Sequence, residues 1–371
     1  MKASSELYFS RLDHLRFLAA LLVLVWHSVH CFVPPSYKVP HLLFALSWFE
    51  EGHTGVSLFL VLSGYIFMTI CHHREMVYRD FLRNRILRIA PLFLFWLTLQ
   101  LWLQPNVDVL KMLGSLLTMT SRNGEMPGVG WTILIEFQFY LLFPFLLGFY
   151  HQSGYLYLVR LLCLFVVLRL LVAISGHDVQ QLAYWSLFGR MDQFLLGMIF
   201  ACWAIQNPEK FSSLFYLMVL FFGLLVFYHL FNHLGGFYDL PPKWKWLWAI
   251  LPTGEGLFYA ALTAHWLHAP LTLPRWLDEG LAWLGKLSFS FYLNHLLVIG
   301  FCAALARKFA FLPNSFLSSL LYTLFFVLPV LTAFSALTYY WIELPFLQMW
   351  RKYVRAIPAR PAEPTETRHA A

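Results

Sequence analysis

The chain has 371 residues, of which 60% are hydrophobic and only 12% are charged. A soluble domain carries about 25% charged residues, so the composition excludes an ordinary soluble domain and indicates a polytopic membrane protein. The formal net charge of +7 would suggest nucleic-acid binding in a soluble chain. Here the positive-inside rule accounts for it better, and we expect no nucleic-acid partner.

Apolar runs of about 20 residues recur along the chain and predict an all-α bundle of about ten membrane-spanning helices. We expect a cytoplasmic N-terminal segment (1–14), one membrane domain (15–345) and a cytoplasmic tail (346–371). The tail from about Val354 has the composition of a disordered segment. The weaker stretch Val107–Thr120 predicts an interfacial or re-entrant helix. The predicted spans are 15–33, 55–71, 86–104, 129–150, 155–174, 184–205, 211–231, 246–267, 283–304 and 316–341.

Lysine and arginine are unevenly distributed between the two sides of these spans. If the N-terminus is cytoplasmic, 15 of the 26 basic residues lie on the cytoplasmic side and 7 outside, with 4 within or at the edges of spans. The positive-inside rule therefore predicts that both termini are cytoplasmic.

The first span contains His27, eleven residues after Arg16. At about 100° per residue the two side chains share one helix face, and at 1.5 Å per residue they lie roughly 16 Å apart along the axis. Arg16 would then lie at the membrane surface and His27 near the middle of the bilayer. An imidazole at that depth is costly unless it is paired or used, which makes His27 a candidate catalytic residue.

The third span begins with three arginines, Arg83, Arg85 and Arg88. The spacing of Arg85 and Arg88 places both guanidinium groups on one face, where they could bind phosphate oxygens bidentately. The alternative is a basic anchor that contacts lipid headgroups.

Glu136 lies within the fourth span and is a second catalytic candidate. A carboxylate inside an apolar helix needs a partner in the bundle. The structural alternative is a salt bridge with Arg190 or Arg169. Asp192 and Arg190 are candidates for a similar structural pair.

These motifs occur in an order that resembles the acyltransferase 3 family of integral-membrane acyltransferases over nearly the whole chain. Many relatives carry an extracellular hydrolase-like domain after the bundle, so the chain, ending at Ala371, resembles a bundle-only member. The stretches that carry the resemblance are Arg16 to His27 preceded by Asp13, Gly55 to Tyr65, Arg85 to Pro91, Trp131 to Pro144 with Glu136 and Tyr140, Phe188 to Gly197, Gly285 to His295, and Trp341 to Pro345 with Glu343.

The resemblance implies transfer of an acyl group, often acetyl, from a coenzyme A thioester to a hydroxyl of a glycan or lipid-linked sugar. It also favours the bacterial cytoplasmic (inner) membrane. Arg16, Arg85 and Arg88 would bind the acyl-CoA co-substrate. His27 would act as general base, or as a nucleophile that forms an acyl-imidazole, and the sequence leaves both mechanisms open.

Four residues are possible supporting residues: Asp13, Ser63, Arg83 and His295. For Ser63 the alternative is close helix packing, for His295 it is a structural role, and Glu343 is expected to cap or anchor the last helix.

The strongest rival function is a transporter or flippase of a lipid-linked sugar or acyl donor, which would also hold buried charges. It would usually show internal repeats, and none is evident. The five isolated cysteines indicate neither a disulfide framework nor a metal site. No phosphate-binding glycine motif supports ATP or NAD, so we expect acyl-CoA as co-substrate, membrane lipids as surroundings, and no bound cofactor or metal.

Overall fold

The computed structural model describes residues 10–33, 37–103, 108–118, 126, 128–309 and 313–356. These residues form a helical bundle with one short two-stranded ribbon. Nine of the described helices are long and apolar enough to span a membrane. The predicted all-α polytopic fold is therefore confirmed.

The long helices and their short connecting elements follow the order of the apolar runs. Two segments of the last long helix, η5 and η6, are π-helical. In chain order the elements are α1 (Ser10–His30), η1 (His41–Leu46), α2 (Ser47–Glu50), η2 (Gly52–Thr54), α3 (Gly55–Cys71), β1 (Arg74–Met76), α4 (Tyr78–Leu103), α5 (Val109–Thr118), α6 (Gly130–Ser153), α7 (Tyr155–Ile174), α8 (Val179–Trp185), α9 (Leu187–Gln206), η3 (Pro208–Phe211), α10 (Leu214–Leu234), α11 (Gly236–Asp239), η4 (Pro242–Ala249), α12 (Leu251–His268), α13 (Arg275–Lys286), α14 (Ser288–Lys308), α15 (Phe316–Tyr322), η5 (Thr323–Val327), α16 (Leu328–Thr338), η6 (Tyr339–Glu343), α17 (Leu344–Leu347) and β2 (Val354–Ala356).

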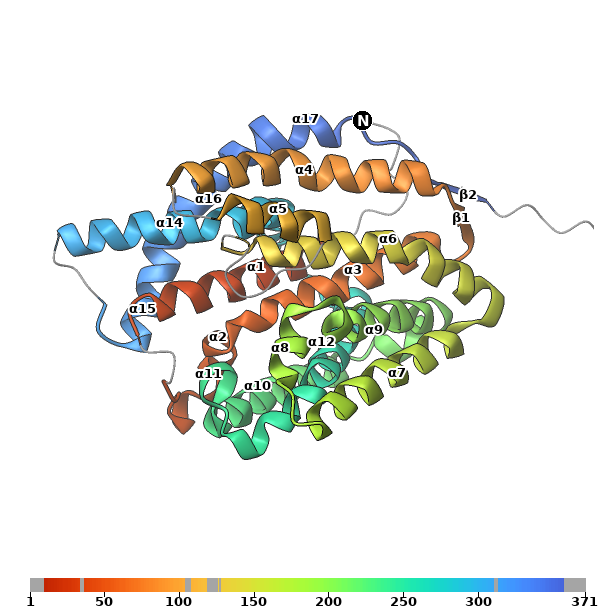
Figure 1. Ribbon diagram of the computed structural model, residues 1–371, viewed down its shortest axis with the longest axis horizontal. Helices are drawn as coiled ribbons and strands as arrows, with labels where there is room; N and C mark the ends of the chain where they lie inside the picture. Colours follow the sequence, from red (N-terminus) through yellow and green to blue (C-terminus); the bar gives the residue numbers. More distant parts are fainter. Residues whose placement is uncertain are drawn as a thin grey trace, which may run out of the picture.

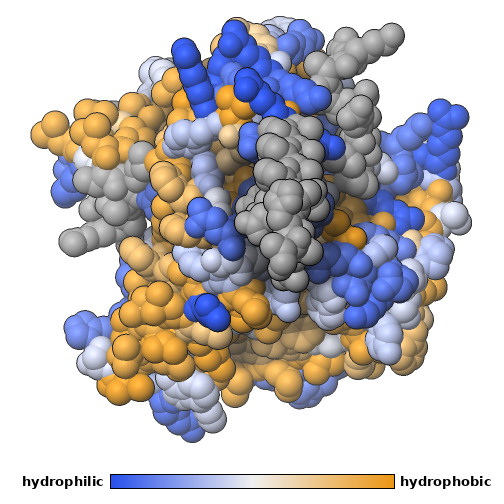
Figure 2. Space-filling view, turned by 90° about the vertical axis from the view of Figure 1, so that its right-hand side faces the viewer, coloured by the Kyte–Doolittle hydropathy of each residue, from blue (hydrophilic) through white to orange (hydrophobic). Residues whose placement is uncertain are grey.

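The bundle has two ends, which we call the terminal end and the distal end. The terminal end holds the start of α1 and the ribbon in which β1 and β2 pair antiparallel, and the distal end holds α2, η2 and α11. Figure 1 shows the ribbon at one extremity and α2 and α11 toward the other. Figure 2 looks onto the terminal end, where hydrophilic side chains gather among apolar ones.

Helix α12 takes the place of the predicted eighth span, 246–267, although it is not among the nine apolar helices. One carboxylate and two histidines make it more polar than the others. Just before it, the ring of Trp248 lies 6.4 Å from that of His53, at the distal end. Just after it, the Ala269 carbonyl accepts a hydrogen bond of 2.7 Å from Arg11, at the terminal end. Helix α12 therefore runs the length of the bundle and is a candidate tenth crossing.

Helices α3 and α9 pack closely through two glycines. A Cβ at Gly64 would lie 2.2 Å from the Phe194 carbonyl oxygen, and a Cβ at Gly197 would lie 2.2 Å from that of Val61. Only glycine fits at such contacts, and small residues bring helix backbones together in this way in membrane proteins. Close helix packing was the alternative role that we considered for Ser63. In the structure, the neighbouring Gly64 makes this close contact.

The structure bears on two further sequence predictions. The stretch Val107–Thr120, predicted as an interfacial or re-entrant helix, contains α5, a helix of only 10 residues, which is too short to span a bilayer; residues 104–107 and 119–125 lie outside the described part. The tail was expected to lose structure from about Val354, but Val354–Ala356 forms β2 against β1. Residues 357–371 lie outside the described residues.

Candidate active site

The centre of the candidate site is a pair of histidines on two helices that are far apart in the sequence. Nε2 of His295, on α14, lies 3.2 Å from Nδ1 of His27, on α1. The same Nδ1 lies 3.0 Å from the Val23 carbonyl oxygen, and Nδ1 of His295 lies 2.7 Å from that of Tyr292. The packing of α1 on α14 thus gives the deeply placed His27 a partner.

The carbonyl partners assign the tautomers of both rings. A carbonyl only accepts, so Nδ1 of His295 carries the hydrogen and its Nε2 has a lone pair when the ring is neutral. Nδ1 of His27 then donates to the Val23 carbonyl and to His295. This leaves the lone pair of His27 on Nε2, which has no hydrogen-bond partner among the described residues. An imidazole held in this way can accept a proton from a bound hydroxyl.

A group of arginines lies between this pair and the terminal end. Arg16 is paired with the buried Asp13 on the same helix, with 2.6 Å between Nη1 and Oδ1. Arg88, on α4, lies 3.6 Å from Oε2 of Glu343, and Oε1 of the same carboxylate accepts a hydrogen bond from Ser290 on α14. Of the two roles expected for Glu343, the structure thus fits an anchor that joins the last long helix to α4 and α14, and not a helix cap.

Arg85, which precedes Arg88 by one turn on α4, has different surroundings. It is buried in a cage of aromatic rings whose centroids lie 4.9 to 6.0 Å from its guanidinium carbon. Its Nε has no hydrogen-bond partner among the described residues. Cation–π contacts hold the charge without using its N–H donors, so the Nε that bonds to no described residue can serve an anionic ligand. The cage consists of Phe67, Phe81, Tyr140, Trp350 and Tyr353.

Glu136, on α6, lies within the field of this arginine group. Its carboxylate accepts a hydrogen bond from Tyr140 one turn later, and Arg88, Arg85 and Arg16 all act on it electrostatically. Four charged groups from three helices therefore surround one region of the bundle.

The two remaining supporting candidates lie apart from this constellation. Arg83 donates a hydrogen bond of 2.8 Å to the Met349 carbonyl and so ties α4 to the C-terminal segment. Ser63 is half-buried on α3, and no hydrogen bond of its side chain to the described residues is seen. Neither contacts His27 or Glu136 in the described part of the chain.

The structural salt bridges that we considered for Glu136 are not formed. Arg169 pairs with Asp192 at 2.7 Å, and Arg190 lies 4.0 Å from Glu255 on α12. The pairing of Arg190 with Asp192 was therefore also wrong. The sequence did not reveal these partners because each pair joins different helices.

Sequence reasoning missed a polar cluster on the distal side of His27. His30, one turn further on, lies 3.2 Å from the carboxylate of the buried Glu50, whose second oxygen has no hydrogen-bond partner among the described residues. Burial raises the pKa of the Glu50 carboxyl, and the contact with His30 opposes the rise. The Trp26 ring meets the His27 ring edge-on, with 4.6 Å between the ring centroids. It also stacks on the Tyr238 ring, with 5.8 Å between the centroids. The signal was the acidic pair Glu50-Glu51 just before an apolar run.

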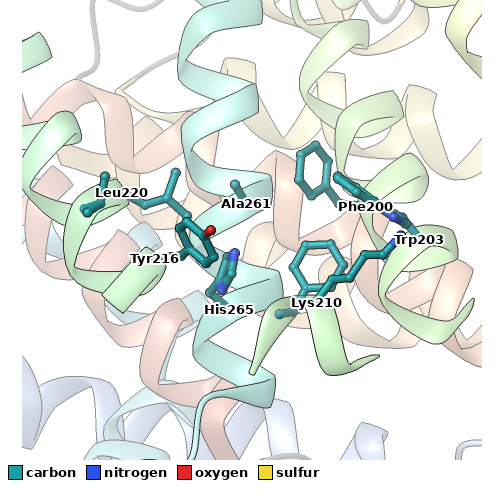
Figure 3. Close-up of a pocket in the computed structure, with 9 residues that line it drawn as sticks. Phe200, Trp203, Lys210, Tyr216, Leu220, Ala261 and His265 are labelled. Atoms are coloured by element: carbon teal, nitrogen blue, oxygen red, sulfur yellow. The ribbon is translucent and has the colours of Figure 1, made fainter. Parts of the chain in front are cut away.

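A separate apolar groove of about 320 Å³ lies between α9, η3, α10 and α12 (Figure 3). It contains none of the predicted site residues. Its polar groups include Lys210, Tyr216 and His265, and it has no carboxylate. The groove therefore offers neither the paired histidines nor the arginine group described above.

Comparison with known families identifies the family of the chain. The model of the acyltransferase 3 family, described as an acyltransferase domain, matches residues 9–356. The protein is thus an integral-membrane acyltransferase. The chain belongs to the acyltransferase 3 family, and the resemblance expected from its motifs is confirmed. No curated protein and no solved structure matched the chain.

Proposed function

We propose that this acyltransferase moves an acyl group, most simply acetyl, from acyl-CoA to a hydroxyl of a glycan or lipid-linked sugar. The observation that carries the proposal is the lone pair on Nε2 of His27, held in place through Nδ1 and without a partner among the described residues. His27 is the general base in this proposal.

The arginine group is the proposed donor site. The phosphates of coenzyme A are highly anionic, and guanidinium groups bind phosphate oxygens with strong, charge-assisted hydrogen bonds. The Nε of Arg85 bonds to no described residue inside the aromatic cage, and Arg88 and Arg16 are both partly exposed. The roughly 16 Å along α1 from Arg16 to His27 suits the extended pantetheine arm. Glu136 offers a carboxylate to the amide N–H groups of that arm.

The reaction then follows from the two sites. Nε2 of His27 takes the proton of the acceptor hydroxyl while the oxygen attacks the thioester carbonyl. The bond from the carbonyl carbon to sulfur breaks, and the sulfur leaves with its electron pair as the coenzyme A thiolate. The proton held by His27 passes to the thiolate, so the enzyme returns to its starting state and the acyl group ends as an ester.

The distal cluster is the proposed acceptor side. The exposed ring of Tyr238, which stacks on the buried ring of Trp26, offers a flat apolar surface of the kind that a sugar ring covers. The unpartnered oxygen of Glu50 offers an acceptor for a sugar hydroxyl. Trp26 contacts His27 and Glu50 contacts His30, one turn further on, so a hydroxyl held there would approach His27 from the distal side.

The positive-inside rule places the terminal end in the cytoplasm, most simply of the bacterial inner membrane, so acyl-CoA would enter there. A reporter fused after Ala371 should then score as cytoplasmic, and one inserted near Asp178 as external. An external score after Ala371 would overturn this orientation.

The function is tested with detergent-purified protein and acetyl-CoA labelled in the acetyl group. We expect labelled ester on a glycan acceptor from the wild type, and at least about a hundredfold less from His27→Ala at equal protein. The matched control is His177→Ala, an exposed histidine at the distal end. Similar transfer by well-folded His27→Ala would remove His27 from the mechanism, and transport of a lipid-linked sugar without ester formation would favour the flippase.

A further inference from the structure

Three histidines from two separate segments meet at the distal end of the bundle. His41 lies on η1, and His229 and His233 lie one turn apart near the end of α10. Each offers a ring nitrogen, and these three nitrogens lie within 4.8 Å of one another. The acyl-transfer site uses none of these residues.

Two of the rings are held by partners outside the cluster. The hydroxyl of Ser47 lies 2.8 Å from Nδ1 of His229, and the carbonyl of Val39 lies 2.9 Å from Nε2 of His233. Histidines that bind metals are oriented in this way, through a hydrogen bond from the ring nitrogen that does not coordinate. The nitrogens left for a ligand are Nε2 of His229 and Nδ1 of His233.

The third ring can complete the set. Nδ1 of His41 lies 2.8 Å from Nε2 of His229, a distance at which one proton must lie between the two nitrogens. A metal ion can replace that proton, since both nitrogens can bind it through their lone pairs. The metal–nitrogen distance of about 2.0–2.1 Å requires the His41 ring to rotate out of its stack on the His233 ring, so that both lone pairs point at the ion. His41 is exposed on a short helix, so its ring has room to turn.

We propose that His41, His229 and His233 bind a transition-metal ion of the zinc class. Imidazole nitrogens suit Zn²⁺, and three protein ligands leave a fourth position for water. Our sequence prediction of no metal site rested on the cysteines alone. The spacing of His229 and His233, one helical turn apart, was the available signal, but His41 is brought to them only by the fold.

The bound ion would fasten the segment before α3 to the end of α10. The same two segments are already joined beside the cluster, where Lys38 donates to the Asn232 carbonyl at 2.7 Å. The side-chain amide of Asn232 in turn donates to the Glu51 carboxylate at 3.1 Å. The expected role is therefore structural and does not depend on acyl transfer.

The test uses full-length protein purified without a histidine tag, stripped of metal and titrated with Zn²⁺ by calorimetry. We expect one ion per chain and affinity at least about tenfold weaker in His41→Ala and in His233→Ala. Ser47→Ala, which removes only the hydrogen bond to His229, should weaken binding by about ten- to a hundredfold. His177→Ala is the control and should bind as the wild type does.

Two further measurements keep the proposal open to refutation if a variant folds poorly. Co²⁺ bound to the wild type should give the visible absorption of a four-coordinate site, which His233→Ala should lack. Zn²⁺ should raise the Tm of the wild type and of His177→Ala but not of His41→Ala. Equal Zn²⁺ affinity in the wild type and both cluster variants would overturn the proposal, as would the absence of binding to the wild type.

Discussion

Two arginine–carboxylate pairs in this bundle differ in how fully the protein satisfies the arginine. Arg169 and Asp192 are both almost fully buried and lie 2.7 Å apart, whereas Arg88 is 22% exposed and lies 3.6 Å from Glu343. Arg169 also donates to the carbonyls of Ala249 and Gly189, so its fork is saturated by the protein. A saturated guanidinium holds helices together, whereas one that is partly exposed and loosely paired can still bind a ligand.

The same comparison, of how many polar partners each charge has, separates the catalytic candidate Glu136 from the structural Asp192. Asp192 accepts from Arg169 and from the hydroxyl of Thr253, each at 2.7 Å, and so keeps little capacity for another partner. Among the described residues, the Glu136 side chain has one hydrogen bond, from Tyr140, and three cations act on it electrostatically. The number of unsatisfied polar groups, rather than depth in the membrane, distinguishes a candidate site from a scaffold here.

The largest expected effect comes from breaking the saturated pair. Asp192→Ala leaves Arg169 buried without its counter-charge, which should cost about 3–5 kcal/mol of stability. We expect little protein in the membrane and a clearly lower Tm in detergent. The double variant Arg169→Met with Asp192→Leu removes both charges and should recover much of the loss. A normal Tm for Asp192→Ala would show that this pair is not the scaffold that the comparison requires.

Changing the loosely paired Arg88 should weaken ligand binding and leave the stability nearly unchanged. Arg88→Lys keeps the charge near Glu343 but loses the planar fork, so binding of coenzyme A should weaken by roughly ten- to a hundredfold while the Tm changes little. Arg85→Lys should act likewise, because lysine cannot offer the same fork from within the cage. The measurement is calorimetry with coenzyme A, and Arg275→Lys, at an exposed surface pair, is the control. Equal affinity in all four proteins would assign these arginines to membrane anchoring.

The sequence predicted candidate residues within single helices and missed the contacts between side chains of different helices. Arg16 and His27 share a face because helical geometry fixes their phase, and Glu136 stands out because charge is rare in an apolar run. The contact of His27 with His295 depends on how α1 packs on α14, and no local pattern encodes that packing.

The membrane spans show the same limit. Nine of the predicted spans can be recognised from the length of their apolar runs, because a helix needs about 20 mostly apolar residues to cross a bilayer. Helix α12 is packed against α3, α9 and α10, and polar side chains are tolerated there because other helices satisfy them. For example, its Glu255 accepts hydrogen bonds from Ser57 and Tyr228. Hydropathy alone undervalues such a buried helix.

The smallest expected effect concerns His295, which we assign as a positioning residue for His27. His295→Ala removes one hydrogen-bond acceptor from Nδ1 of His27, whereas the Val23 carbonyl remains as its partner. The loss of one such bond, worth about 0.5–1.5 kcal/mol, should lower kcat roughly threefold to tenfold. This is far less than the loss expected for His27→Ala, because the base itself is still present.

The conservative variant distinguishes positioning from packing. His295→Gln restores an acceptor oxygen toward His27 but fills the space less well than imidazole, so it should regain kcat without regaining any lost Tm. Single-turnover acetyl transfer and thermal unfolding, measured on the same preparations, provide the two readouts. If kcat in His295→Ala and His295→Gln follows the Tm instead of the presence of the acceptor, His295 only fills space between α1 and α14. In that case the tautomer of His27 is fixed by its own helix through the Val23 carbonyl.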